Sequence, residues 1–131
     1  MTQRSSQRTK KRDKKAPIYS VVDLETTGTN VNHGDRIIQI GCVLVQDGEI
    51  INHFETKINP REKIPRSIVQ LTGIEDKDVR KAPLFEDIAG TIYSLLAETT
   101  FVAHNVNFDF PFLNAELERA GYPSLSIPAI D

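Results

Sequence analysis

The sequence predicts an α/β fold, a mixed five-stranded sheet with flanking helices, and three observations support this prediction. Two apolar strand-like segments in the N-terminal half meet at Asp47-Gly48, the signal of a tight hairpin turn. The C-terminal half alternates helical periodicity with short apolar strands, as layered α/β domains do. At 131 residues, the chain has the length of one domain with a substantial core.

The N-terminal strands are predicted from apolar runs rich in β-branched residues, at residues 17–24, 37–45 and 49–58. In the third strand Ile50, Phe54 and Ile58 share one face, which we expect to be covered, and Ile51 lies on the wetter face. Residues 29–35 are a loop by composition.

The later elements follow from helical spacing and turn residues. They are a short helix over 66–71, a turn or short helix over 74–82, a helix opened by Pro83, a strand over 99–103, a helix over 108–120 and a strand over 127–130. Pro111 is expected in the first turn of the last helix, where its missing N–H matters least.

Charge is distributed unevenly along the chain. The net charge is −2, yet residues 1–15 contain seven basic residues and one acidic residue, whereas residues 16–131 contain nine basic and 17 acidic residues. We expect residues 1–16 to be a basic disordered arm, which either follows phosphates or only aids solubility. Residues 17–131 are then the folded domain.

Targeting signals and cysteine usage indicate the compartment. No apolar run approaches the roughly 20 residues of a membrane span, and no apolar segment of a secretory signal follows the basic N-terminus. The single cysteine, Cys42, excludes an internal disulfide and a cysteine-based zinc cluster, and it is expected to be a buried thiol. We therefore expect a cytoplasmic protein with no membrane partner.

The first strand ends in two carboxylates, Asp23 and Glu25, which point to the same face because they lie two residues apart. Like charges this close repel, and a hard cation such as Mg²⁺ or Mn²⁺ would remove the penalty. In a chain this acidic, an Asp-x-Glu pattern also arises by chance. Thr26, Thr27 and Gly28 then turn the chain, with Gly28 free to take a positive φ.

A second acidic position, Asp109, follows the fourth strand and opens the last helix. An aspartate there is often only a cap or first-turn residue. The alternative is that Asp109 completes the Asp23 and Glu25 cluster, because a fourth strand beside the first brings both to the C-terminal edge of the sheet. Three such carboxylates could hold two divalent cations about 4 Å apart, as in-line phosphoryl hydrolysis requires.

These segments resemble the motifs of a known family. Asp23-Leu24-Glu25-Thr26-Thr27-Gly28 is similar to the first motif of the DEDD superfamily of 3′–5′ exonucleases, of the DnaQ-like or DNA polymerase III epsilon-like type. His104-Asn105-Val106-Asn107-Phe108-Asp109-Phe110 resembles the second motif, and Leu71-Thr72-Gly73-Ile74 resembles a recurrent segment between them. The resemblance covers residues 17–131 and implies an RNase H-like fold. Residues 101–123 also resemble exonuclease domains fused ahead of a DinG-type helicase in Gram-positive bacteria.

The resemblance implies a nuclease that uses two Mg²⁺ or Mn²⁺ ions to release nucleoside monophosphates from a single-stranded 3′ end, with DNA as the expected substrate. Asp23 would bridge both ions, Glu25 would bind the ion on the nucleophile side, and Asp109 would bind the other. Substrate contacts are implied for Thr26, Thr27 and Gly28 at the terminal nucleotide, Leu71 or Ile74 beside its base, Phe108 at the sugar pocket, and His104 and Asn105 in the loop that carries Asp109. The implied partner is a helicase or a polymerase, in the same chain or a separate one.

The third motif of the family is missing from this sequence. It is a general-base His or Tyr followed five residues later by an Asp, and it would lie after the fifth strand, whereas the sequence stops at Asp131. We therefore expect a C-terminally truncated exonuclease domain that is inactive or nearly so alone, since a general base contributes about 10²–10⁴-fold.

Two other interpretations remain open. A non-catalytic nucleic-acid- or protein-binding module attached to a helicase or polymerase would keep the fold, and the absence of His-x₄-Asp after residue 131 would favour it. A structural Ca²⁺ site would use the same acidic residues, although the strand-end position argues against it. A base-independent mechanism on a single strand leaves DNA and RNA undistinguished.

Overall fold

The computed structural model describes residues 16–131, so the predicted basic arm lies outside the described residues except for its last position. The chain folds into one mixed sheet in the order β3-β2-β1-β4-β5. The strands are β1 (Ile18–Thr26), β2 (Ile37–Gln46), β3 (Glu49–Lys57), β4 (Thr100–Val102) and β5 (Ala129–Ile130). β1, β2 and β3 form an antiparallel meander, and β4 and β5 extend it in parallel beside β1. The predicted mixed five-stranded sheet is confirmed.

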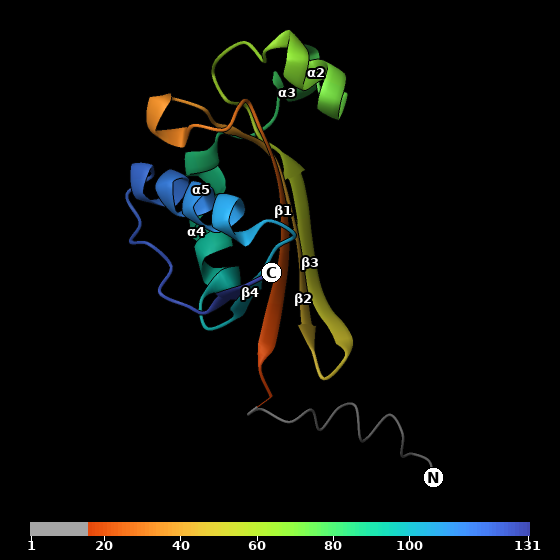
Figure 1. Cartoon of the computed structure of the whole chain (residues 1–131), viewed down its shortest axis with the longest axis vertical. Coiled ribbons are helices and arrows are strands. Elements are labelled where there is room, and N and C mark those ends of the chain that lie inside the picture. The colour runs from red at the N-terminus through yellow and green to blue at the C-terminus, as the bar shows by residue number, and fades with distance from the viewer. Residues whose placement is uncertain (1–15) are drawn as a thin grey trace.

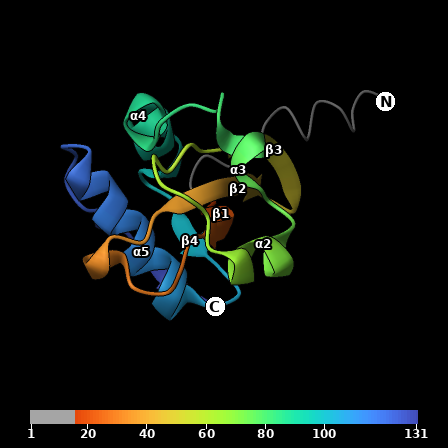
Figure 2. The same cartoon turned by 90° about the horizontal axis from the view of Figure 1, so that it is seen from above.

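The helices cover one face of the sheet and one of its ends (Figure 1). They are the 3-10 turn η1 (Val31–His33), α2 (Arg66–Thr72), α3 (Asp76–Val79), α4 (Phe85–Leu96) and α5 (Val106–Arg119). α4 and α5 pack on the same face, whereas α2 and α3 lie beyond the end of β1. Seen from above, α2 stands across β1 from α4 (Figure 2). None of the helices within residues 16–131 is long and apolar enough to cross a membrane.

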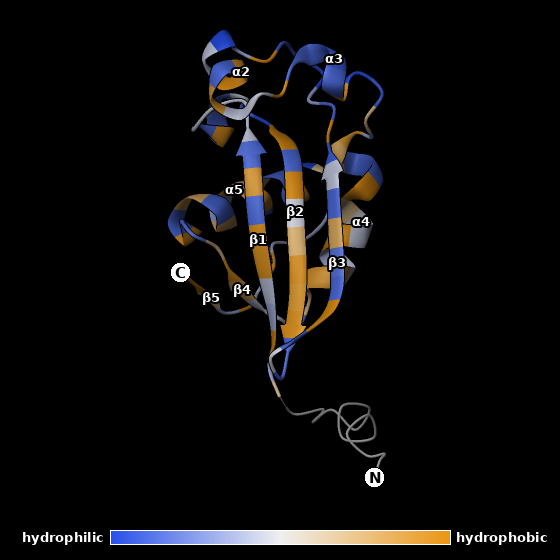
Figure 3. Ribbon diagram, turned by 90° about the vertical axis from the view of Figure 1, so that its right-hand side faces the viewer, coloured by the Kyte–Doolittle hydropathy of each residue, from blue (hydrophilic) through white to orange (hydrophobic). Residues whose placement is uncertain are grey.

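Strand alternation separates a core face from a free face. Val22 and Leu24 of β1 are buried beneath α4 and α5, together with Phe112 and Leu117 of α5. Each such side chain contributes about 1.5–3 kcal/mol when fully buried. Val21, Asp23 and Glu25 alternate with these buried residues, so they lie on the opposite face of the strand. α4 and α5 leave that face of the sheet uncovered (Figure 3).

A second, smaller core holds α2 and α3 against the start of β2. Its buried members are Ile38, Ile64, Ile74 and Val79. Ile38 belongs to β2, so this cluster ties the two short helices to the sheet. Helices of this length are marginal alone, and tertiary packing therefore keeps them folded.

The prediction for β3 was wrong at one end. The register shifts between Leu44 and Val45, so that Ile51 is the extra residue of a bulge. Ile51 then packs against the core with Phe54, while Ile50 is 68% exposed. A bulge reverses which residues of the strand face the core beyond it. A prediction that assigns every second residue to one face cannot detect this reversal.

The prediction for α5 was also wrong at its start. The helix begins at Val106 rather than at residue 108, so Pro111 lies inside the helix and not in its first turn. The Val106 N–H donates to Asp131 Oδ1 at 3.0 Å, and the Asn105 carbonyl accepts from Asp109 N–H at 2.9 Å. A carboxylate at the end of β5 thus satisfies a donor at the start of this helix, a partner that lies far away in the sequence.

Candidate active site

The carboxylates of β1 occupy the free face of the sheet. Asp23 is exposed and Glu25 is half-buried, and both alternate with the buried residues of the same strand. Asp23 pairs with Gly41 of β2, where an added Cβ would meet no heavy atom within 4 Å. The space beside the Asp23 carboxylate is therefore open.

Asp109 lies in the first turn of α5 and is only 7% exposed. Within residues 16–131 its carboxylate makes no hydrogen bond or ion pair. Burial, followed by the negative charges of Asp23 and Glu25, raises the pKa of Asp109 to about 6, while His104 opposes the rise. The structure thus brings Asp109 under the direct electrostatic influence of both β1 carboxylates, because β4 lies beside β1.

The same physics acts on Glu25, whose pKa is raised first by burial and then by Asp23. The raised pKa values of Glu25 and Asp109 report mutual repulsion among negative charges, and carboxylates supply the hard oxygen donors that suit Mg²⁺ or Mn²⁺. As the side chains stand, the described chain contains no group of three or more His, Cys, Asp or Glu residues that could hold a metal ion. The donor chemistry fits divalent ions, and the two-ion arrangement stays a prediction.

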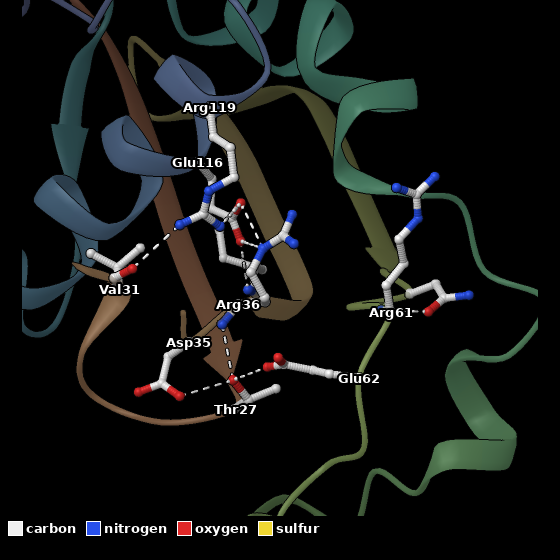
Figure 4. Close-up of polar contacts among 10 residues, drawn as sticks. Thr27, Val31, Asp35, Arg36, Arg61, Glu62, Glu116 and Arg119 are labelled. Carbon is white, nitrogen blue, oxygen red and sulfur yellow. Dashed lines mark hydrogen bonds and ion pairs between the residues drawn. The ribbon is translucent and has the colours of Figure 1, made fainter. Parts of the chain in front are cut away.

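Thr27 has a different role from the predicted one. It is 3% exposed, and its hydroxyl accepts the Arg36 N–H at 2.9 Å (Figure 4). That hydroxyl also lies 3.3 Å from Asp35 and 3.2 Å from Glu62, the carboxylates to which it can donate. The Thr27 amide donates to the Arg36 carbonyl at 2.8 Å. Both polar groups are used to hold the loop, which leaves neither for a nucleotide.

Gly28 is required for a reason other than the predicted one. Its φ is not among the positive values of the described chain, which include Gly34 and Gly73. A Cβ at Gly28 would lie closer than 3.0 Å to the Asp35 carboxylate. The Thr26 hydroxyl donates to the Gly28 carbonyl at 2.6 Å, which tightens the same turn. Close approach of a carboxylate, and not a left-handed conformation, demands glycine.

The other predicted substrate residues are placed as follows. Ile74 is 5% exposed in the small core and offers no surface to a base, so Leu71, at 80% exposed, is the member of this pair that can contact one. His104 and Asn105 are exposed in the loop before α5. Phe108 is half-buried and packs on Phe112, with ring centroids 5.3 Å apart.

Sequence reasoning missed a buried ion pair that positions α5. Glu116 is 1% exposed and accepts from Arg36 Nε at 3.1 Å, from Ile37 N–H at 2.9 Å and from Arg119 at 3.3 Å (Figure 4). These bonds connect α5 to the segment between β1 and β2. A signal existed, because Glu116 falls within the apolar stripe of the helix beside Leu117, where a charge needs a partner.

An antiparallel meander extended by parallel strands, with carboxylates at its C-terminal edge, defines an RNase H-like nuclease domain. The family model described as "Exonuclease" (RNase_T) matches residues 20–130, and the chain belongs to this exonuclease family. The predicted resemblance to DnaQ-like exonucleases is confirmed.

Named relatives agree with this assignment. The chain is 43% identical over 104 residues to "3'-5' exonuclease DinG" of Bacillus subtilis, covering 79% of this chain and 11% of that protein. It is 40% identical over 120 residues to "DNA polymerase III PolC-type" of Staphylococcus haemolyticus, covering 92% of this chain and 8% of that protein. The chain therefore spans about a tenth of the length of these relatives.

The solved structure of E. coli exonuclease I in complex with a dT13 oligonucleotide superposes with a TM-score of 0.77 at 21% identity. The match covers 88% of this chain and 28% of that one. This likeness confirms the RNase H-like fold.

Proposed function

We propose that the chain is the metal-dependent catalytic domain of a larger enzyme that removes nucleotides from the 3′ end of a single strand, with DNA as the substrate. The observation that carries the proposal is the position of buried Asp109 at the start of α5, just after β4, where Asp23 and Glu25 of the neighbouring strand β1 act on its carboxylate electrostatically. Membership of the exonuclease family supports the reaction class. The names of the DinG and PolC-type relatives support the 3′–5′ direction and DNA.

Asp23, Glu25 and Asp109 would hold two Mg²⁺ or Mn²⁺ ions. Such ions, when bound, lower the pKa of water and neutralise charge on a scissile phosphodiester. The chain's own residues supply position. α5 holds Asp109 at the edge of the sheet, and the favourable interaction with His104 opposes protonation of its carboxylate.

The surroundings of the carboxylates fit a nucleotide. Gly41 leaves the space beside Asp23 open, and exposed Leu71 offers an apolar surface for a terminal base. Phe108 would support the sugar or base from the first turn of α5. A polymerase or helicase, in the same chain or a separate one, is the proposed partner, and the PolC-type relatives support a polymerase.

The test is a titration of Mn²⁺ into the chain by calorimetry at pH 7.5. Asp23→Asn should abolish the binding heat, because it removes a carboxylate that would hold the ions. Glu86→Gln is the matched control, since Glu86 is an exposed carboxylate of α4 on the other side of the sheet. Equal binding by wild type and Asp23→Asn would contradict the proposed site.

A further inference from the structure

A charged groove lies between α2 and α3, with a volume of about 690 Å³. Four basic side chains line it: Lys63, Arg66, Lys77 and Arg80. Residues 16–131 contain nine basic and 17 acidic residues, so almost half of the cations of an acidic domain gather at this one place.

None of the four basic side chains forms an ion pair within the described part of the chain. Two acidic residues, Glu75 and Asp76, line the groove beside the four cations. Asp76 Oδ1 accepts the Ile64 N–H at 2.9 Å, and the Glu75 backbone carbonyl accepts the Asp78 N–H at 2.9 Å at the start of α3. The positive charges therefore outnumber the negative ones and stay available to an anionic ligand.

The groove adjoins the candidate active site. Glu62, which precedes Lys63, accepts from the Thr27 hydroxyl at 3.2 Å, and Thr27 lies two residues beyond Glu25. Figure 3 shows α2 directly beyond the tip of β1, and Figure 1 shows it on the side of the sheet that α4 and α5 leave free. The free side also carries the Asp23 carboxylate.

The groove is held rigidly against the sheet. The small core that contains Ile64 and Val79 joins both walls of the groove to Ile38 of β2. The Asp76 bond to Ile64 ties the start of α3 to the segment before α2. The distance between the basic side chains and the β1 carboxylates is thus set by packing, as a path for an extended ligand requires.

We propose that this groove binds the phosphodiester backbone of a single-stranded nucleic acid whose 3′ end lies at Asp23, Glu25 and Asp109. The inference rests on the proposed function and adds the path of the strand away from the site. Lys and Arg that neutralise phosphates bind without reading bases, and each contact makes affinity depend on salt. An acidic peptide would match the charge, but the link from the groove through Glu62 and Thr27 to the strand that carries Glu25 favours the nucleic acid.

The test compares two double variants of the 131-residue chain that carry the same change in charge. Lys63→Gln/Arg80→Gln removes two cations of the groove. Arg61→Gln/Lys81→Gln removes an exposed Arg and an exposed Lys that lie at most two residues away in the sequence but outside the groove. Binding of 5′-fluorescein-dT12 is followed by anisotropy in EDTA, which prevents metal-dependent hydrolysis, between about 50 and 400 mM KCl.

The groove variant should reduce the slope of log K against log salt by about 1.4, since each phosphate contact on a single strand contributes about 0.7. The same estimate corresponds to roughly 25-fold weaker binding at 0.1 M salt, with the curves converging near 1 M. The control variant should keep most of the wild-type slope. Equal losses in the two variants, or no binding of dT12 by wild type at low salt, would overturn the proposal.

Two further arms complete the design. A (Glu)12 peptide that binds with the same slope and the same loss in the groove variant would assign the groove to acidic proteins and overturn the nucleic-acid proposal. Asp23→Asn should bind dT12 in EDTA at least as tightly as wild type, because it removes a negative charge. The Mn²⁺ titration tests the carboxylate site separately. Loss of the groove proposal would show in dT12 binding alone, whereas loss of the proposed function would show in Mn²⁺ binding.

Discussion

Replacement of Asp109 by Asn should stabilise the metal-free domain at neutral pH. The pKa of Asp109 rises from 3.8 to about 6 on folding, because the carboxylate is buried beside two others. Between about pH 4 and pH 6 the native state holds a proton that the unfolded chain has released, so the free energy of unfolding falls as pH rises through this window. Above pH 6 both states are ionised, and the penalty is complete.

The size of the effect follows from the shift. One pKa unit corresponds to 1.36 kcal/mol, so the ionised Asp109 costs the native state at most about 3 kcal/mol. Asn has nearly the same shape without the charge. We therefore expect Asp109→Asn to gain little at pH 4 and up to about 3 kcal/mol at pH 8.

Urea unfolding at pH 4, 5, 6 and 8 in EDTA measures this difference. Glu118→Gln is the control, because it removes an exposed charge from the same helix. The alternative interpretation of Asp109 as a first-turn residue predicts the opposite sign, since a negative charge near a helix N-terminus stabilises by about 0.3–1 kcal/mol. A loss of stability in Asp109→Asn at pH 8 would therefore refute the reasoning.

Three other predictions concern the scaffold. Glu116→Ala should lower the free energy of unfolding by about 1–3 kcal/mol, because it leaves the buried Ile37 N–H without its acceptor and the partly exposed Arg36 without its partner. Exposed Glu118→Ala should stay within about 0.5 kcal/mol in the same denaturant assay. Gly28→Ala should lower the thermal midpoint of unfolding, because the added Cβ would clash with the Asp35 carboxylate. Gly41→Ala should keep or raise the midpoint, because no neighbour lies within 4 Å of its added Cβ. Equal shifts of the midpoint in the two variants would contradict this reasoning. Burial raises the pKa of the Cys42 thiol to about 11. A disulfide reagent should therefore label Cys42 slowly at pH 8 until denaturant is added. Fast labelling of the native protein would count against a buried thiol.

The strands and helices could be predicted because each is encoded within a few neighbouring residues. The hairpin at Asp47-Gly48, the helical spacing of α4 and the apolar run of β2 are local signals, and all appear at the predicted places. The errors arose where distant residues decide. The bulge at Ile51 depends on pairing with β2, and the early start of α5 at Val106 depends on Asp131.

The candidate active site shows the same contrast between local signals, which the sequence reveals, and contacts between distant residues, which it does not. Asp23 and Glu25 could be chosen as candidate ligands from the sequence because their spacing on one strand carries chemical meaning without the rest of the fold, and their role as ligands stays a prediction. The roles of Thr27 and Gly28 could not be predicted, since Arg36 and Asp35 reach them only after the loop has closed. Motif membership identified these residues as important, but it did not distinguish those that hold the loop from those that face a substrate.

The register of β1 links the core to the chemistry. Val22 and Leu24 must face α4 and α5, and the buried Ser20 hydroxyl lies 2.8 Å from that of Thr99, which fixes the strand against the segment before β4. A slip of one residue would turn every side chain to the other face and would bury Asp23. The apolar residues that stabilise the sheet therefore also determine which face the carboxylates occupy. For this reason a change at Leu24 should affect metal binding as well as stability, although its side chain is buried in the core on the other face of the strand.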